Sequence, residues 1–253
     1  MGAKATKNLN DNFFQTWSPD MAYVLGYFVA DGCLTVDKRR SNSLSLNITS
    51  KDKTHLYQIR RVLDSTHKIG SKSNGRGDIS FQIQIRNSAL AEDLQNLGIH
   101  PRKTYNLKPL DIPSDHFSDF VRGFFDGDGS VYIYKVNNVP QIKASFVCTS
   151  FAFLTDLNTR LCKFLNITDK SIHRKNNRIN RIPLYDIVFY IDDCIQLYQF
   201  MYGGQSRLFL PRKKRIFERW LSMKRRVFTK RNYPSKVGWH LNSKIKIYSI
   251  MRV

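Results

Sequence analysis

The sequence predicts an α+β protein built from two pseudo-symmetric copies of one αββαββα unit. Two observations support this fold class. The Asp-Gly sequences "LGYFVADGCL" (25–34) and "GFFDGDGSV" (123–131) recur with the same spacing of small residue, apolar run and acid, and matching strand–helix segments follow each copy. Internal repetition of this kind indicates that each unit folds alike and packs against its counterpart.

Helix start signals mark the first helix of each unit. Ser18-Pro19-Asp20 offers an N-cap, a proline at the first helical position and an early acid, and Ser114-Asp115 predicts a similar start in the second unit. Further along, Ser50 and Ser150 each end a Thr-Ser pair just before an amphipathic segment. We therefore expect both serines to be N-caps of the following helices.

Alternating segments supply the strands. In "ISFQIQIR" (79–86) the apolar residues take every second position, and "LSLNIT" (44–49) repeats the pattern. Such alternation predicts sheets with one face packed on helices and one polar face outward. The matching strand–helix segments are 44–63 with 144–165, and 79–99 with 183–202.

The repeat also divides the chain. Residues 18–107 form the first predicted repeat and residues 115–222 the second, which closes with "LPRKKRIFERWL". Between them, "KPLDIPS" (108–114) carries two prolines and is typical of a linker. Residues 223–253 have no counterpart in the first half, so we expect a basic C-terminal tail.

The charge of the chain indicates a polyanionic partner. The sequence holds 41 Lys and Arg against 20 Asp and Glu, a formal net charge of +21. Nucleic acid is the first candidate and an anionic membrane surface the second. No apolar run is long enough to span a membrane, and the polar N-terminus predicts neither a signal nor a transit peptide. We expect the protein in the cytoplasm of a prokaryote, or in an organellar matrix if it is organelle-encoded.

Cysteine and histidine usage excludes several kinds of site. Cys33, Cys148, Cys162 and Cys194 are widely spaced and form no CxxC pair, which predicts buried free thiols in a reducing compartment. The six histidines show no zinc-ligand spacing.

The two Asp-Gly helices carry small residues four positions apart. Gly26 and Ala30 lie on one face of the first helix, and Gly123 and Gly127 on one face of the second. This spacing lets two helix backbones approach closely. We therefore expect the two helices to pack against each other along these faces.

Packing of this kind would place Asp31 and Asp128 side by side at the helix C-termini. Adjacent carboxylates repel, and the C-terminal end of a helix already carries partial negative charge. A divalent cation relieves both effects. Carboxylates, neighbouring carbonyls and a phosphate are the hard oxygen ligands that Mg²⁺ prefers.

The stretches "VLGYFVADG" (24–32) and "VRGFFDGDG" (121–129) resemble the two LAGLIDADG motifs of a single-chain homing endonuclease, and the resemblance covers about residues 18–222. It implies two curved antiparallel sheets that form a DNA-binding saddle, with the two motif helices at the interface. It also implies a monomer with an internal pseudo-two-fold axis that cuts both strands of a weakly palindromic target of roughly 20 bp. Such cleavage promotes mobility of the host intron and uses Mg²⁺, for which Mn²⁺ substitutes. No membrane and no small-molecule substrate is implied.

The resemblance also implies roles for the residues at the helix ends. The last acid of each motif, Asp31 and Asp128, would bind the catalytic metal ions together with the backbone carbonyls of Ala30 and Gly127. The earlier motif acid is Asp126 in the second copy and a valine in the first, and this position is not a metal ligand in the family.

Basic residues beyond the last strand of each repeat assist catalysis in family members. The matching positions here are Lys103 in "HPRKTY" and Lys213 in "LPRKKR", with Arg212 and Lys214 as alternatives to Lys213.

The polar faces of the sheets are the predicted reading surfaces. Gln82, Gln84 and Arg86 can pair with adenine and guanine, whereas the matching strand of the second repeat offers chemically different groups, which predicts unlike half-sites. The full predicted DNA-binding set is Thr35, Lys38, Arg39, Arg40, Ser45, Asn47, Ser80, Gln82, Gln84, Arg86, Ser130, Tyr132, Tyr134, Gln141, Lys143, Ser145, Arg178, Arg181, Asp186, Val188 and Tyr190.

Two other functions fit the same scaffold. One is an RNA-binding maturase that helps an intron fold, for which the basic tail could serve. The other is a catalytically inactive DNA-binding regulator. Retention of both motif acids argues against the regulator, because a pure binder has no use for paired carboxylates in a phosphate groove.

Overall fold

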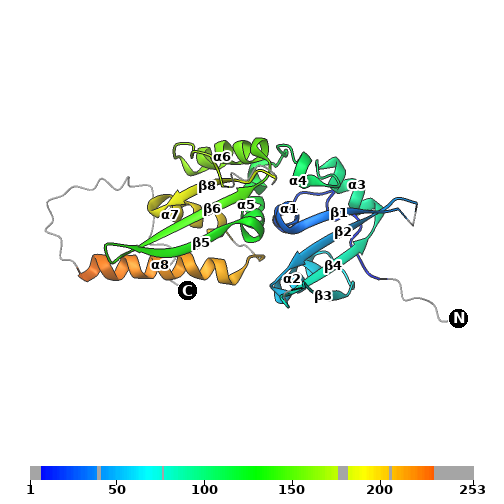
Figure 1. Cartoon of the computed structure of the whole chain (residues 1–253), viewed down its shortest axis with the longest axis horizontal. Coiled ribbons are helices and arrows are strands. Elements are labelled where there is room, and N and C mark those ends of the chain that lie inside the picture. The colour runs from blue at the N-terminus through cyan, green and yellow to red at the C-terminus, as the bar shows by residue number, and fades with distance from the viewer. Residues whose placement is uncertain (1–6, 39–40, 76, 176–181, 205–206, 231–253) are drawn as a thin grey trace.

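The computed structural model describes residues 7–38, 41–75, 77–175, 182–204 and 207–230. Two four-stranded antiparallel sheets lie on either side of a central helix pair, α1 (Pro19–Asp31) and α5 (Phe117–Asp128) (Figure 1). The remaining elements of the first half are β1 (Gly32–Asp37), β2 (Ser43–Ser50), α2 (Lys53–Val62), β3 (Ile69–Ser73), β4 (Ile79–Arg86), α3 (Ser88–Asn96) and α4 (Lys103–Asn106). Those of the second half are η1 (Ser114–His116), β5 (Ser130–Val136), β6 (Val139–Cys148), α6 (Phe151–Leu165), β7 (His173–Arg174), β8 (Tyr185–Tyr190), α7 (Ile191–Tyr202) and α8 (Pro211–Lys230).

The two sheets share one strand order. It is β1-β2-β4-β3 in the first sheet and β5-β6-β8-β7 in the second. The predicted α+β fold of two αββαββα repeats is therefore confirmed. The second half adds α8, which packs on α7 and on strands β5 and β6. This helix continues through the predicted start of the tail at 223, and residues 231–253 lie outside the described part of the chain.

Two of the predicted helix caps are confirmed. The Ser18 side chain accepts a hydrogen bond from the Met21 amide at the start of α1, with proline at the first helical position. The Ser150 side chain caps α6 in the same way through the amide of Phe153.

The other two caps were wrong. Ser50 is the last residue of β2, and the N-cap of α2 is Asp52. Since Ser50 lies two residues too early, its hydroxyl instead accepts from the Asp52 amide (3.1 Å) and from the Tyr27 hydroxyl (2.9 Å). Ser114 starts a 3-10 turn, so α5 itself begins three residues later at Phe117.

The cores under the two sheets differ in chemistry. Beneath the first sheet, aliphatic residues such as Leu46 and Ile83 are buried. Beneath the second, aromatic rings meet: the Phe146 centroid lies 6.1 Å from that of Phe124 and 5.9 Å from that of Phe189. The predicted apolar row of β4 is buried only in its inner half, because Ile79 at the outer end of the strand is 58 % exposed.

All four cysteines are free, and Cys148, Cys162 and Cys194 are buried as predicted. Cys33 is exposed instead, because it alternates outward in β1 next to the buried Leu34. Among the described residues, no helix combines the length and apolar character needed to cross a bilayer.

Candidate functional site

Helices α1 and α5 cross in direct backbone contact. A Cβ atom added at Gly26 would lie 2.1 Å from the carbonyl oxygen of Phe120, and one added at Gly123 would lie 2.0 Å from that of Tyr23. Real Cβ atoms never approach this closely, so only glycine fits either position. The predicted packing through small residues is therefore present in the structure, and it is nearly symmetric.

This crossing brings the two motif acids together. Asp31 and Asp128 are the last residues of α1 and α5, and a Cβ atom added at Gly127 would lie 3.5 Å from an Asp31 carboxylate oxygen. Both acids reach the protein surface, but the protein around them desolvates the carboxyl groups, which raises the pKa of Asp31, and the nearby Tyr27 hydroxyl opposes that change. Burial, followed by the negative charge of Asp31, raises the pKa of Asp128 to about 6. The two carboxyl groups therefore lie close enough for the charge of one to oppose ionisation of the other.

A lysine caps each of these helix ends. Lys213 is 4 % exposed, and the N–H groups of its ammonium are shared among the carbonyls of Phe125 (2.5 Å), Asp126 (2.8 Å), Gly127 (3.2 Å) and Gly129 (2.5 Å). Its burial lowers its pKa to about 8.

Lys103 makes the matching contacts at the end of α1. Its ammonium donates to the carbonyls of Val29 (2.5 Å) and Ala30 (3.3 Å), and burial lowers its pKa. Each predicted basic residue thus reaches the motif helix of its own repeat.

The two alternatives to Lys213 are engaged elsewhere. Arg212 forms an ion pair with Asp52 of the first repeat at 3.0 Å. Lys214 pairs with Glu218 at 3.4 Å and lies over the ring of Phe209. Of these three neighbouring bases, Lys213 is the one whose side chain meets the end of α5.

The acids and lysines are matched crosswise between the repeats. Burial raises the pKa of both carboxyls. Against it, Lys213 lowers the pKa of Asp31 more than Lys103 does, and Lys103 lowers that of Asp128 more than Lys213 does. On this basis we define two composite sites, each with the helix-end carbonyl that its lysine holds least closely. Site A comprises Asp31, the Gly127 carbonyl and Lys213, and site B comprises Asp128, the Ala30 carbonyl and Lys103.

The composite sites suit a hard cation that is completed by ligands from outside the protein. Neither Asp31 nor Asp128 has an ion pair within the described residues, and the carbonyls of Ala30 and Gly127 are the ones held least closely by their lysines. No group of three His, Cys, Asp or Glu side chains gathers in the described ranges. Mg²⁺ commonly binds through one or two carboxylates while phosphate and water fill its other positions. The donor set therefore fits Mg²⁺.

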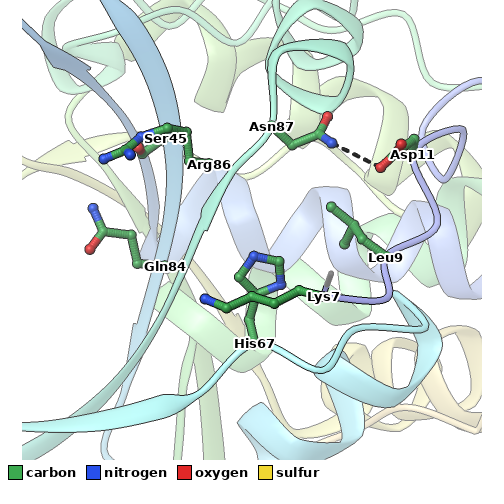
Figure 2. Close-up of a pocket in the computed structure, with 8 residues that line it drawn as sticks. All are labelled: Lys7, Leu9, Asp11, Ser45, His67, Gln84, Arg86 and Asn87. Atoms are coloured by element: carbon green, nitrogen blue, oxygen red, sulfur yellow. Dashed lines mark hydrogen bonds between the residues drawn. The ribbon is translucent and has the colours of Figure 1, made fainter. Parts of the chain in front are cut away.

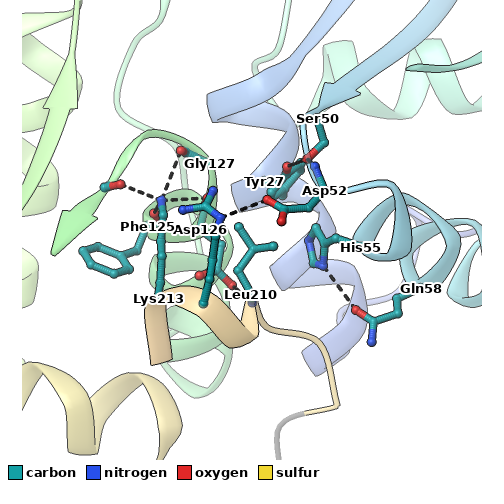
Figure 3. Close-up of polar contacts among 12 residues, drawn as sticks. Tyr27, Ser50, Asp52, His55, Gln58, Phe125, Asp126, Gly127, Leu210 and Lys213 are labelled. Atoms are coloured by element: carbon teal, nitrogen blue, oxygen red, sulfur yellow. Dashed lines mark hydrogen bonds and ion pairs between the residues drawn. The ribbon is translucent and has the colours of Figure 1, made fainter. Parts of the chain in front are cut away.

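Asp126 occupies a different environment from the two terminal acids. It is buried, and its Oδ2 atom accepts from the Tyr23 hydroxyl (2.6 Å) and the Leu210 amide (2.7 Å). Figure 3 shows Asp126 on α5 beside Leu210 and Lys213. Burial raises its pKa to about 6. The Tyr23 hydroxyl also lies 3.0 Å from Nε2 of buried His55. Sequence reasoning set this acid aside as a non-ligand and missed its place in the network.

The polar faces of the two sheets carry different residues in the same cross-strand row. Thr35, Ser45 and Arg86 lie side by side on β1, β2 and β4. The matching row on β5, β6 and β8 is Tyr132, Lys143 and Tyr190, with the Lys143 ammonium 5.5 Å from the centre of the Tyr190 ring. The second sheet therefore presents an aromatic and cationic row where the first presents small polar groups and one arginine.

Most of the predicted reading residues are accessible, but four are buried. Central strands place short side chains beneath longer neighbours: Asn47 donates to the Thr35 hydroxyl (2.8 Å) and accepts from Gln82 (3.0 Å). Exposed members are Thr35, Lys38, Gln84, Arg86, Ser130, Tyr132 and Tyr190, and half-buried ones are Ser80, Gln82, Tyr134, Gln141, Lys143 and Val188. Buried members are Ser45, Asn47, Ser145 and Asp186, which correct the expectation that this whole face is open. Arg39, Arg40, Arg178 and Arg181 lie outside the described residues.

A segment before the first predicted repeat borders the same face. The amide of Asn10 donates to the carbonyl of Leu63 (3.0 Å), and that of Thr66 to the carbonyl of Asn8 (3.1 Å). Here the chain lines a hollow together with three residues of the predicted DNA-binding set, Ser45, Gln84 and Arg86 (Figure 2). The residues around it are Lys7, Leu9, Asp11, Ser45, His67, Gln84, Arg86 and Asn87. Sequence analysis missed this segment because it has no periodicity, and its basic Lys7 was the only signal.

Comparison with known proteins agrees with this geometry. Residues 18–97 match the family model described as "LAGLIDADG-like domain". The solved structure of the homing endonuclease I-GzeII in complex with its DNA target is similar over 87 % of this chain and 94 % of that one, with 12 % identity and a TM-score of 0.58. I-AabMI bound to uncleaved DNA covers 85 % and 92 %, with 14 % identity and a TM-score of 0.56. I-LtrWI bound to target DNA covers 87 % and 92 %, with 12 % identity and a TM-score of 0.53.

No curated protein sequence matches the chain. The resemblance read from the two motifs is confirmed at the level of the fold, which is that of LAGLIDADG homing endonucleases along both repeats.

Proposed function

We propose that this chain, with the fold of LAGLIDADG homing endonucleases, is a site-specific DNA endonuclease that makes a double-strand break. The observation that carries the proposal is the meeting of Asp31 and Asp128 at the crossing of α1 and α5, each with a capping lysine. Two acids in a chain of net charge +21 have a clear use where a phosphodiester must be bound and hydrolysed.

Each composite site would serve one DNA strand. Asp31 with the Gly127 carbonyl, and Asp128 with the Ala30 carbonyl, would hold Mg²⁺, and Mn²⁺ would substitute. When bound, the ions supply Lewis-acid activation of the phosphodiester and of the attacking water.

The lysines would act on the charge that develops during cleavage. Lys213 and Lys103 are fixed at the helix ends beside the acids, where burial lowers the pKa of Lys213 to about 8. A preorganised cation with little surrounding water stabilises a developing negative charge strongly. We infer that each ammonium stabilises this charge electrostatically from its place at the helix end, where its N–H groups donate to backbone carbonyls.

The sheets would carry target recognition. Two copies of one sheet on either side of the helix pair match two half-sites spaced along a duplex, giving a target of roughly 20 bp. The differing rows, with Arg86 in one sheet and Tyr190 in the other, favour unlike half-sites and a weakly palindromic target. Cleavage of such a site in an intronless gene copy would promote mobility of the host intron.

Incubation with Mg²⁺ and a library of partly randomised long duplexes tests the proposal. We expect cleavage of both strands within a limited set of related sequences. Duplex binding without cleavage in either Mg²⁺ or Mn²⁺ would indicate the inactive regulator instead. Preferential binding of a structured intron RNA over every duplex would indicate the maturase.

The salt dependence of duplex affinity gives a second test. Lys and Arg contacts release counterions in proportion to the phosphates neutralised, so affinity should fall steeply as salt rises. A log–log slope near zero between low and physiological salt would rule out a protein that follows the groove of DNA.

A further inference from the structure

Side chains of α5 form hydrogen bonds with the backbone of the segment that precedes α8. The matching side chains of α1 are apolar and form no such bonds with the segment around α4. Asp126 accepts from the amide of Leu210, and Arg122 donates to the carbonyls of Leu208 and Met201, each at 2.9 Å. In α1 the matching positions hold Leu25 and Val29, which form no polar side-chain bonds. The difference lies in the sequence of the two motif helices themselves.

These hydrogen bonds determine how firmly the backbone that carries each lysine is held. Lys213 follows Leu210 by one turn on the 20-residue helix α8, and its ammonium meets four carbonyls. Lys103 begins the four-residue helix α4, directly after Arg102, whose φ of 60° lies in the left-handed region. Its ammonium meets two carbonyls. Site A is therefore built before DNA arrives, whereas site B depends on a short segment with few bonds.

The α4 segment has tethers of its own, but these bonds come from the other repeat. The Thr149 hydroxyl donates to the carbonyl of Thr104 (2.7 Å), and the Ser150 hydroxyl donates to that of Leu107 (2.6 Å). Both donors lie in the turn between β6 and α6, so the order of α4 depends on how the second repeat sits against the first. The segment before α8 is held within its own repeat.

We propose that Asp126 is a positioning residue that presets site A through the Leu210 amide, so that the strand served by site A is cut before the strand served by site B. The proposal rests on the proposed endonuclease function. A reactant group that is already placed contributes to the rate without further ordering, whereas a group that must be ordered on binding slows its own step. Asp126 does not touch the reacting atoms in this scheme, because both donors to its Oδ2 atom are protein groups.

A substitution series at position 126 separates positioning from folding. Asp126→Val installs the residue found at the matching position 29 and removes both hydrogen bonds. Asp126→Asn can keep both, since its amide oxygen can take the place of Oδ2 and its NH₂ group the place of Oδ1, which has no partner among the described residues. Tyr23→Phe removes the bond from α1 and leaves the bond to Leu210.

The experiment follows both strands of one duplex target, each labelled with its own 5′ fluorophore, under single-turnover conditions with Mg²⁺. The strand slowed most by Lys213→Met is assigned to site A. In the full-length wild-type chain we expect this strand to be cut about tenfold faster than the other, with a nicked intermediate. Asp126→Val should slow that strand and leave the other nearly unchanged, whereas Asp126→Asn and Tyr23→Phe should preserve the order.

The outcomes are distinct. Equal rates for the two wild-type strands overturn the proposal, even if Asp126→Val fails to fold. Equal slowing of both strands by Asp126→Val, or loss of the order in Tyr23→Phe, also overturns it, because the effect would then reside in the helix packing. If no duplex is cut under any condition, the endonuclease function itself fails, and that result cannot be confused with uniform cleavage of both strands.

Discussion

At the crossing of α1 and α5 the two repeats are nearly interchangeable, whereas at the lysines they are not. An added Cβ atom would meet a backbone oxygen at 2.1 Å from Gly26 and at 2.0 Å from Gly123. By contrast, Lys213 is held by four carbonyls in a segment bonded to Asp126, and Lys103 by two carbonyls in a short helix. The repeats thus agree where both must supply the same close contact, and they differ where each builds its own site.

The contrast shows what a departure from a motif can mean. Val29 and Asp126 occupy the same motif position, and neither lies where a metal ligand is expected. The structure gives the acid a separate task, because Asp126 ties α5 both to α1 and to the segment before α8. A position that does not bind metal can still determine how firmly the lysine of one site is held compared with the lysine of the other.

The largest effect should come from the two terminal acids, where the repeats are expected to be equivalent. We expect Asp31→Asn and Asp128→Asn each to lower double-strand cleavage by more than about 10³-fold, or about 4 kcal/mol, because each removes the carboxylate of one site. Duplex affinity should stay the same or rise, since a negative charge near phosphate is removed. Cleavage on labelled duplexes and binding in Ca²⁺ measure the two effects.

Wild-type cleavage rates in both variants would sink the assignment of these acids. A large loss in one variant only would show that the sites are not equivalent in metal use. Asp37→Asn is the matched control, since this carboxylate lies on β1 and pairs with Arg86 at 3.4 Å, away from the helix ends.

The helix crossing gives the next largest effect and tests its symmetry. Gly26→Ala and Gly123→Ala each force a methyl group into a backbone carbonyl that cannot rotate away, so we expect each to destabilise the fold by roughly 3 kcal/mol or more. Gly70→Ala is the control, because an added Cβ there meets nothing within 4 Å. Urea denaturation measures all three variants. Losses of very different size at the two helix glycines would contradict a symmetric crossing.

Buried His55 should produce a smaller effect that depends on pH. Burial lowers its pKa to about 4, opposed by Gln58 and Asp52 and reinforced by the charges of Arg212 and Lys213. As pH falls below about 6.5, His55 becomes protonated in the unfolded chain but stays neutral in the folded chain. The free energy of unfolding therefore decreases between about pH 6.5 and pH 4. The unfolding free energy of His55→Gln, relative to wild type, should therefore rise by about 2 kcal/mol from pH 7 to pH 5.

Denaturation of both chains at the two pH values isolates the histidine, because the other titrating groups are shared. A pH-independent difference between them would show that His55 titrates normally. No counterpart test exists in the second repeat, because α6, which begins at Phe151 after its N-cap Ser150, contains no histidine.

Much of the fold could be predicted from the sequence, because repetition and alternation report local geometry directly. The helix pair, the succession of helices and strands along each repeat and the caps at Ser18 and Ser150 follow from such patterns. The cap at Ser50 failed, since a Thr-Ser pair looks the same whether the strand ends before it or runs through it. The prediction that a tail begins at residue 223 likewise ended helix α8 too early. Basic residues occur in helices as readily as in tails, so composition did not show where the helix ends.

The sequence predicted which residues form the site, but not how the lysines are arranged around the two acids. The pairing of Asp31 and Asp128 follows from helix spacing, but the crosswise match of acids and lysines depends on three-dimensional packing that no local pattern encodes. Burial of Ser45 and Asn47 was missed for a related reason. Alternation reports which face a side chain takes, but it does not show whether a longer neighbour covers it.

The smallest predicted effect concerns the polar faces of the two sheets, which carry different side chains at matching positions. Gln84 is exposed on β4 and is paired across the sheet with Asn47 on β2, whereas the matching position on β8 is Val188. Glutamine can form two hydrogen bonds with adenine, and one such contact discriminates between bases by about 1–3 kcal/mol. We therefore expect Gln84→Ala to relax base preference at one or two positions of one half-site.

The same substitution should leave the other half-site unchanged, because Val188 and its row lie on a separate sheet. Ile85→Ala is the matched control one residue along β4, where the side chain is buried: it should weaken folding by roughly 2–5 kcal/mol and leave base preference alone. Cleavage of every single-base variant of the target, profiled for wild type and both variants, makes the comparison. Uniform slowing of all targets by Gln84→Ala would mean that the polar face of the first sheet does not read sequence. A relaxed preference confined to one half-site would show that the two repeats share a helix crossing but read DNA with different chemistry.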